Sequence, residues 1–142
     1  MFGTLAQNII KSNIYLTLGT TNGHMSWVAP VFYCHGEDGC FYFSSQKNSR
    51  HIKDLNFTNR VSFAIFDSHA GEGKGNGIQG TGKVNHLSGK SLTRGLKIYH
   101  TSFLAPGETK FRPGVYQLYR LKPTCMYVLD PECHVDKRVL VS

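Results

Sequence analysis

Short runs of β-branched and aromatic residues recur along almost the whole chain, and this recurrence constrains the fold more than any single motif. Ser26–Cys34, Phe41–Ser45 and Arg60–Asp67 all have the composition of strands. The same composition is found at Asn13–Gly19, Ile78–Leu87, Val115–Leu121 and Thr124–Leu129. Six or seven strands with short connections favour a small barrel over alternating βαβ units.

Helices are few and short in this interpretation. Leu5–Lys11 has the spacing of a short amphipathic helix, and Ser88 can cap a helix that carries Leu92, Leu96 and Ile98. Pro30 lies within a strand and cannot donate a ladder hydrogen bond, so it predicts an edge, a bulge or a break that faces a ligand. At 142 residues, the chain is expected to form one domain, residues 1–142.

The sequence predicts neither a membrane span nor an export signal. No apolar run approaches the roughly 20 residues that a spanning helix needs. The first residues, Met1–Asn8, contain no basic segment followed by an apolar one, so we expect a cytoplasmic protein that does not act at a membrane.

The segment Phe41–Asp67 predicts a site for an anion. It has the pattern of a strand, a polar loop, a short helix and a second strand. The side chains of Ser49, Arg50 and His51 are expected where the helix begins, and there free backbone N–H groups and the helix dipole favour an anion such as phosphate. Without a ligand, Ser49 could cap the helix and Arg50 could pair with Asp54.

Basic residues are concentrated in one part of the chain. Between Lys83 and Lys122 lie eight Lys and Arg residues and one acid, Glu108, so this segment accounts for the net charge of +7. A basic segment can bind nucleic acid or another polyanion, but no nucleic-acid recognition motif is present. We therefore do not expect nucleic acid to be the partner.

The four cysteines predict neither a disulfide nor a metal site. Cys34 and Cys40 flank a hairpin connection, but without a secretory signal they are expected to be reduced thiols. Cys34-His35 and Cys133-His134 are adjacent pairs, whereas structural zinc sites use wider, regular spacings. No metal is expected.

The sequence Gly75-Asn76-Gly77-Ile78-Gln79-Gly80 matches the G-x-G-x-x-G pattern of dinucleotide-binding folds. That pattern must open a helix and precede an acidic residue about 20 positions later. Here the chain continues as a strand through Val84, and no acid lies between Glu72 and Glu108. We interpret the pattern as the end of a glycine-rich loop, His69–Gly77.

The order of these segments resembles one known family. Tyr15-Leu16-Thr17-Leu18, Trp27–Phe32, Ser49-Arg50-His51, Asn59–Phe66 and Gln79–Val84 together are similar to the pyridoxamine 5′-phosphate oxidase-like family of FMN-binding split β-barrels. The resemblance covers nearly the whole chain. It implies a mainly β (α+β) fold, namely a six- to seven-stranded antiparallel split β-barrel with a few short helices.

The resemblance also implies a homodimer with FMN at the subunit interface and hydride or electron transfer through the flavin. An electron donor such as NAD(P)H or a small-molecule substrate would be its other partner. The implied flavin contacts fall into three groups. The cofactor-binding residues it implies are Trp27, Val28, Ala29, Pro30 and Val31 along the isoalloxazine, Ser44, Ser45, Ser49, Arg50 and His51 around the phosphate, and Gln79.

Two departures from the family pattern narrow the expectation. The C-terminus, Asp136–Ser142, lacks the Arg-x-His element that engages substrate in the true oxidases, so oxidation of vitamin B6 is not expected. His51 stands where the family has lysine. A flavin- or haem-binding module without turnover, and a basic protein that binds polyanions, remain as alternatives. No catalytic residue is assigned.

Overall fold

A computed structural model describes residues 2–73, 76–101, 114–133 and 137–142. The strands among these residues form one antiparallel sheet that curls into a half-barrel, as expected for a split β-barrel. The strands that form the path are ordered β2-β1-β5-β6-β7-β4-β3, and β8 pairs with β7. Their bounds are β1 (Tyr15–Thr21), β2 (Ser26–Phe32), β3 (Cys34–His35), β4 (Phe41–Gln46), β5 (Arg60–Phe66), β6 (Gly77–His86), β7 (Tyr116–Leu129) and β8 (Arg138–Leu140).

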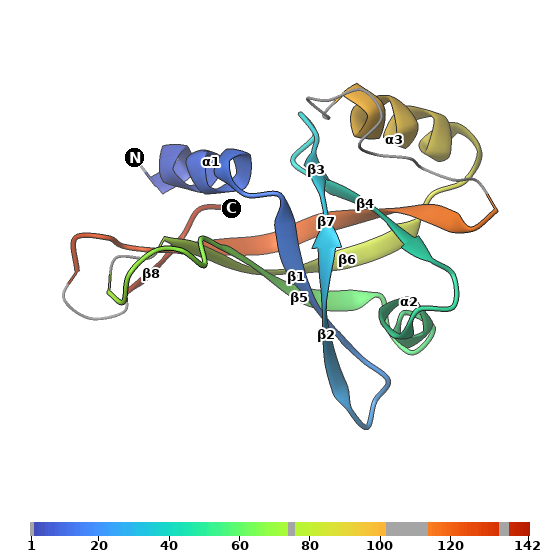
Figure 1. Ribbon diagram of the computed structural model, residues 1–142, viewed down its shortest axis with the longest axis horizontal. Helices are drawn as coiled ribbons and strands as arrows, with labels where there is room; N and C mark the ends of the chain where they lie inside the picture. The colour runs from blue at the N-terminus through green and yellow to red at the C-terminus, as the bar shows by residue number, and fades with distance from the viewer. Residues whose placement is uncertain (1, 74–75, 102–113, 134–136) are drawn as a thin grey trace.

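Three helices pack around this sheet: α1 (Phe2–Ser12), α2 (Arg50–Asp54) and α3 (Gly89–Thr101). Figure 1 shows α1 and α3 over opposite ends of the sheet, with α2 at the turn between β4 and β5. The main core lies inside the curl, where Phe41, Phe43, Leu16, Leu18 and Ile65 are almost fully buried. A smaller core that includes Tyr42, Leu87 and Leu118 lies beneath α3.

Alternation along the strands separates a core face from an outer face. Leu16, Leu18 and Phe63 point into the core, whereas Thr17, Gly19 and Ser62 lie on the outer face. No helix packs over the outer face along β2, β1, β5 and β6 in the described residues. Among the helices that the structure describes, α3 alone covers part of the sheet from outside, at β3, β4 and β7.

Two details of the strands differ from the prediction. The segments 115–121 and 124–129 form one continuous strand, β7, because a register shift opposite Thr81 and Gly82 accommodates Pro123 within the ladder. β1 begins at Tyr15 and continues through Thr20 and Thr21, beyond the predicted strand Asn13–Gly19, and the turn that follows runs from Asn22 to Met25.

One other prediction is confirmed. Among the described strands, β2 lies at the edge of the sheet and pairs only with β1, which accounts for the tolerance of Pro30. No disulfide joins any of the four cysteines. Cys34 and Cys40 lie on the same hairpin, but Cys34 is opposite Tyr42, so the two cysteines are only diagonal neighbours. In the described residues, no helix is long and apolar enough to cross a membrane.

Candidate functional site

The helix α2 is held against the sheet by a buried polar contact. The Thr20 hydroxyl on β1 donates a 2.8 Å hydrogen bond to the Asp54 carboxylate, and both residues are about 5% exposed. Ile52, on the same helix, is buried in the core. Asp54 therefore orients the helix. It does not pair with Arg50, although the ligand-free interpretation of the sequence would have paired these two residues.

The helix dipole attracts an anion at the start of α2 less strongly than expected, because this helix has only five residues. Ser49 occupies the N-cap position without capping the helix through its side chain. Its hydroxyl instead donates a 2.7 Å hydrogen bond to the carbonyl oxygen of Gln46. An anion at this place would depend on side chains rather than on the helix end.

Three of the predicted phosphate residues meet at one imidazole nitrogen. Nε2 of His51 lies 2.8 Å from the Ser45 hydroxyl and 3.5 Å from the Ser49 hydroxyl. Burial lowers the pKa of His51 below its ordinary value, and the charge of Asp54 offsets part of this effect. Ser45 is 6% exposed, so it fixes the imidazole from within, whereas Ser49 lies closer to solvent.

Arg50 lies against the single tryptophan of the chain. Its guanidinium carbon is 4.1 Å from the centroid of the Trp27 ring, within the range of a cation–π interaction. Trp27 is 41% exposed at the edge strand β2. The contact connects the predicted phosphate residues on α2 with the strand that is predicted to line a flavin.

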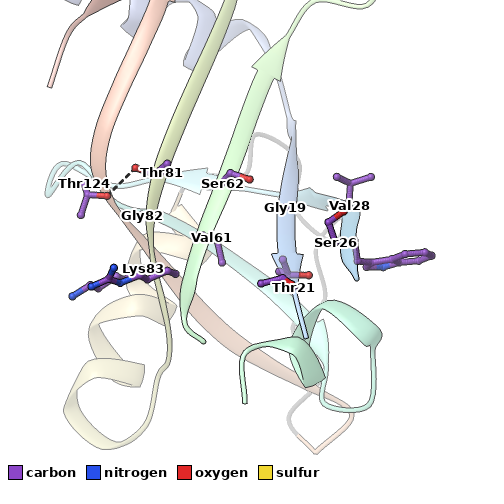
Figure 2. A pocket seen from close by; sticks show the side chains of 13 residues that line it. Gly19, Thr21, Ser26, Val28, Val61, Ser62, Thr81, Gly82, Lys83 and Thr124 are labelled. Carbon is purple, nitrogen blue, oxygen red and sulfur yellow. Dashed lines mark hydrogen bonds between the residues drawn. The ribbon is translucent and has the colours of Figure 1, made fainter. Parts of the chain in front are cut away.

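Trp27 also borders a shallow cavity of about 730 Å³, which we call the pocket. Its floor is made of small side chains from three neighbouring strands, because Gly19, Ser62 and Thr81 are in register across β1, β5 and β6. Figure 2 shows Ser26 and Val28 at one side of the pocket and Lys83 at the other. The lining comprises Gly19, Thr20, Thr21, Ser26, Trp27, Val28, Arg60, Val61, Ser62, Thr81, Gly82, Lys83 and Thr124.

Gly19 keeps this floor flat. A methyl group at this position would collide with the Ser62 hydroxyl oxygen. The Thr81 hydroxyl, also in the floor, is held in place by 3.1 Å contacts with the Thr124 hydroxyl and the Cys125 thiol. The result is a level surface suited to a planar ring system.

The remaining predicted residues are not gathered at this pocket. Ala29 and Val31 are buried, at 8% and 4% exposure, so a ligand could reach only their backbone. Ser44 forms a 3.1 Å hydrogen bond with the Tyr99 hydroxyl on the α3 side of β4. Pro30 and Gln79 occupy the same row of the outer face, but β1 and β5 separate them, and Gln79 accepts a hydrogen bond from Arg138.

The sequence analysis missed the floor and the basic end of the pocket. Gly19, Ser62 and Thr81 are small or polar residues at alternating strand positions, which is the only local signal they give. In the sequence, Lys83 stands out only as the first residue of the basic segment, and Arg60 is an isolated charge outside it. Among the described residues, no group of three His, Cys, Asp or Glu side chains is placed to hold a metal ion.

Comparison with known proteins confirms the fold. No family model and no curated protein matches the sequence. Among solved structures, a heme binding protein from Mycobacterium smegmatis aligns with a TM-score of 0.78 and 15% identity over 99% of this chain. The chain spans 58% of that protein's length.

Two further solved structures match most of both chains. An FAD binding protein from M. smegmatis aligns with a TM-score of 0.68 and 17% identity, covering 98% of this chain and 96% of that one. A protein from Clostridium acetobutylicum, related to general stress protein 26 of B. subtilis and assigned to the pyridoxinephosphate oxidase family, has a TM-score of 0.68 and 14% identity. It covers 99% of this chain and 93% of that protein. The chain therefore has the fold that the sequence resemblance implied.

Proposed function

We propose that this protein binds FMN on the outer face of its sheet and works as a flavin-dependent oxidoreductase. The observation that carries the proposal is the position of Arg50. Its guanidinium stacks on Trp27 at the border of a flat-floored pocket, and His51 and Ser49 lie beside it on the same turn. A phosphate held by these three residues would leave a planar ring free to extend over the pocket floor.

The residues present fit a flavin in size and chemistry. The 730 Å³ of the pocket falls within the usual range of small-ligand sites, about 300–1,000 Å³. Val28 offers an apolar contact on one side, while the hydroxyls of Ser62 and Thr81 offer polar contacts below. When bound, the flavin supplies the hydride or electron transfer. The chain supplies charge for the phosphate, a flat support for the ring and partial exclusion of water.

Haem fits this pocket less well. Haem iron needs an axial ligand such as His, Cys, Met or Tyr. None of the described residues that line the pocket is of these types. The likeness to a heme binding protein is therefore support for the fold, and flavin is the better ligand for this chain.

We further propose that a second copy of the chain covers the outer face, as the family resemblance implies. Large apolar side chains remain exposed in the rows that continue the pocket floor: Phe66 is 54% exposed, Val28 65% and Leu140 58%. Tyr15 and Tyr127 lie in the same rows, at 54% and 37%. An apolar patch of this kind on a sheet face commonly marks a protein interface.

FMN reconstitution tests the proposal. We expect the purified protein to bind FMN with a flavin absorption spectrum, and Arg50→Met to weaken binding by roughly 10- to 100-fold, because an ionic hydrogen bond to phosphate is lost. Arg94→Met removes a cation that is also exposed, from α3, and is the matched control. If wild-type protein takes up no FMN, or if both variants bind it alike, the proposed site is wrong.

Two measurements test the remaining parts. Stopped-flow reduction by NADH or NADPH distinguishes an oxidoreductase from a binding module, which would hold flavin without being reduced. Sedimentation equilibrium should give a dimer, and Phe66→Glu should shift it toward monomer because the charge would be buried at the interface. A monomeric wild-type protein would contradict the interface.

A further inference from the structure

The net positive charge of this chain is not spread evenly over the fold. Three cations from different strands lie side by side, and two of them, Arg60 and Lys83, line one end of the pocket. Arg60 on β5 is opposite Lys83 on β6, and Lys83 is opposite Lys122 on β7. Directly opposed residues share a face, and their Cβ atoms lie about 5 Å apart. We call Arg60, Lys83 and Lys122 the cation row.

The cation row has no internal charge compensation. In the described residues no carboxylate forms an ion pair with any of its three members, although each side chain is exposed. Asp38 does not compensate the row, because its carboxylate accepts a 2.5 Å hydrogen bond from Tyr42 and interacts with the charge of Arg120. Like charges directly opposite each other across strands destabilise a sheet. A bound anion would remove that cost.

The cation row is anchored in a different part of the sheet from Arg50. Arg50 lies on Trp27 of the edge strand β2, whereas the nearest member of the row, Arg60, lies two strands away on β5. With strands about 4.8 Å apart, the backbone of Arg60 lies about 10 Å from that of β2, and the backbone of Lys83 lies about 14 Å from it. Arg60 and Lys83 nevertheless line the same pocket as Trp27. Arg50 thus stacks on Trp27 at the border of the pocket, and Arg60 and Lys83 belong to its lining; we call these two places the two cationic ends.

We infer that the cation row binds the phosphate or pyrophosphate group of a second small ligand, which shares the pocket with the proposed flavin. The two cationic ends would hold two different anionic groups, with the flat floor of Gly19, Ser62 and Thr81 between them. That this second ligand exchanges electrons with the flavin rests on the proposed function. The anion site itself does not.

Calorimetric titration with inorganic pyrophosphate at constant ionic strength, without flavin, tests the site. We expect saturable binding that weakens about two- to fivefold for each of Arg60→Gln, Lys83→Gln and Lys122→Gln, the range of exposed charge pairs. The triple variant should lose measurable binding. The matched control is Lys11→Gln/Lys90→Gln/Arg94→Gln, which removes the same charge from the surfaces of α1 and α3 and should bind like wild type.

Thermal unfolding provides a second readout that does not depend on the titration. Without anions, the triple variant of the cation row should be at least as stable as wild type, because opposed charges are removed. Pyrophosphate should raise the melting temperature of wild type and of the control, but not that of the row variant. A row variant that is less stable without anions would contradict the inference.

Three other outcomes would also overturn the inference. Equal losses in the row variant and the control would mean that the anion responds only to net charge. A loss confined to His51→Gln would place pyrophosphate at the flavin phosphate position. Tight, salt-dependent binding of duplex DNA without any pyrophosphate response would favour a polyanion surface. Failure of FMN reconstitution, by contrast, would leave the pyrophosphate results unchanged and would contradict only the proposed function.

Discussion

The hydroxyl of Thr20 and the carboxylate of Asp54 join β1 to α2 through a 2.8 Å hydrogen bond in which both partners are buried. The two residues are 34 positions apart in the sequence. This contact fixes the helix that carries Arg50 and His51, so the geometry of the candidate phosphate site depends on it.

Removing either partner of this contact should loosen α2. We expect Asp54→Leu or Thr20→Val alone to cost about 1–3 kcal/mol of unfolding free energy, because each leaves a buried polar group without its partner. Both should also weaken FMN binding. The double variant should be more stable than the sum of the two losses predicts, as urea unfolding of all four proteins would show. Strict additivity would mean that the contact does not anchor the helix.

Stability should fall with decreasing pH in a way that depends on His51. Burial lowers the pKa of this imidazole in the folded protein, so the unfolded chain takes up its proton at higher pH. The stabilisation is complete above the unfolded pKa of about 6.5 and is lost as pH falls toward the lower folded value. Burial also lowers the pKa of His35, so this residue contributes a further loss of stability as pH falls.

Urea unfolding between about pH 7.5 and pH 5 measures this dependence. We expect His51→Gln to reduce the slope of unfolding free energy against pH, with His24→Gln as an exposed control. An unchanged slope in His51→Gln would mean that the imidazole is not desolvated in the folded protein.

Filling the pocket floor should displace the flavin. In Gly19→Ala, the new methyl group meets the Ser62 hydroxyl oxygen, which must then turn into the pocket. We expect FMN affinity to fall roughly tenfold, the scale of a modest steric penalty. Adding Ser62→Ala should restore most of it. Gly77→Ala is the control on the outer face, because its methyl group would meet only ordinary contacts of 3.6 and 3.7 Å.

The stability of the C-terminal end of α1 should depend on the phenol of Tyr33. The Tyr33 hydroxyl lies 2.6 Å from the Ile10 carbonyl oxygen and 3.0 Å from that of Asn13. Tyr33→Phe removes this donor and should cost about 1–3 kcal/mol of unfolding free energy, because the helix carbonyls lose a buried partner. Tyr15→Phe, at an exposed tyrosine, should change stability little. If the two variants unfold alike, the phenol does not stabilise the helix end.

The local part of the candidate site could be predicted because its residues are close in the sequence. Ser45, Ser49 and His51 meet across one turn, and hydroxyl and imidazole groups at that spacing already indicated a polar cluster. The length of α2 and the burial of Ser45 could not be predicted in this way, since both depend on packing against β1 and the core.

The sequence by itself predicted most of the strand segments, an edge, bulge or break at Pro30, and the polar turn that carries Arg50, because alternation, the missing N–H of proline and turn chemistry are local properties. Only the tertiary structure decided which strands pair and in what register. That register brings Gly19, Ser62 and Thr81 into one floor and sets Arg60, Lys83 and Lys122 side by side. Pairing between distant strands is fixed by burial of their common core face, so no local pattern in the sequence contains it.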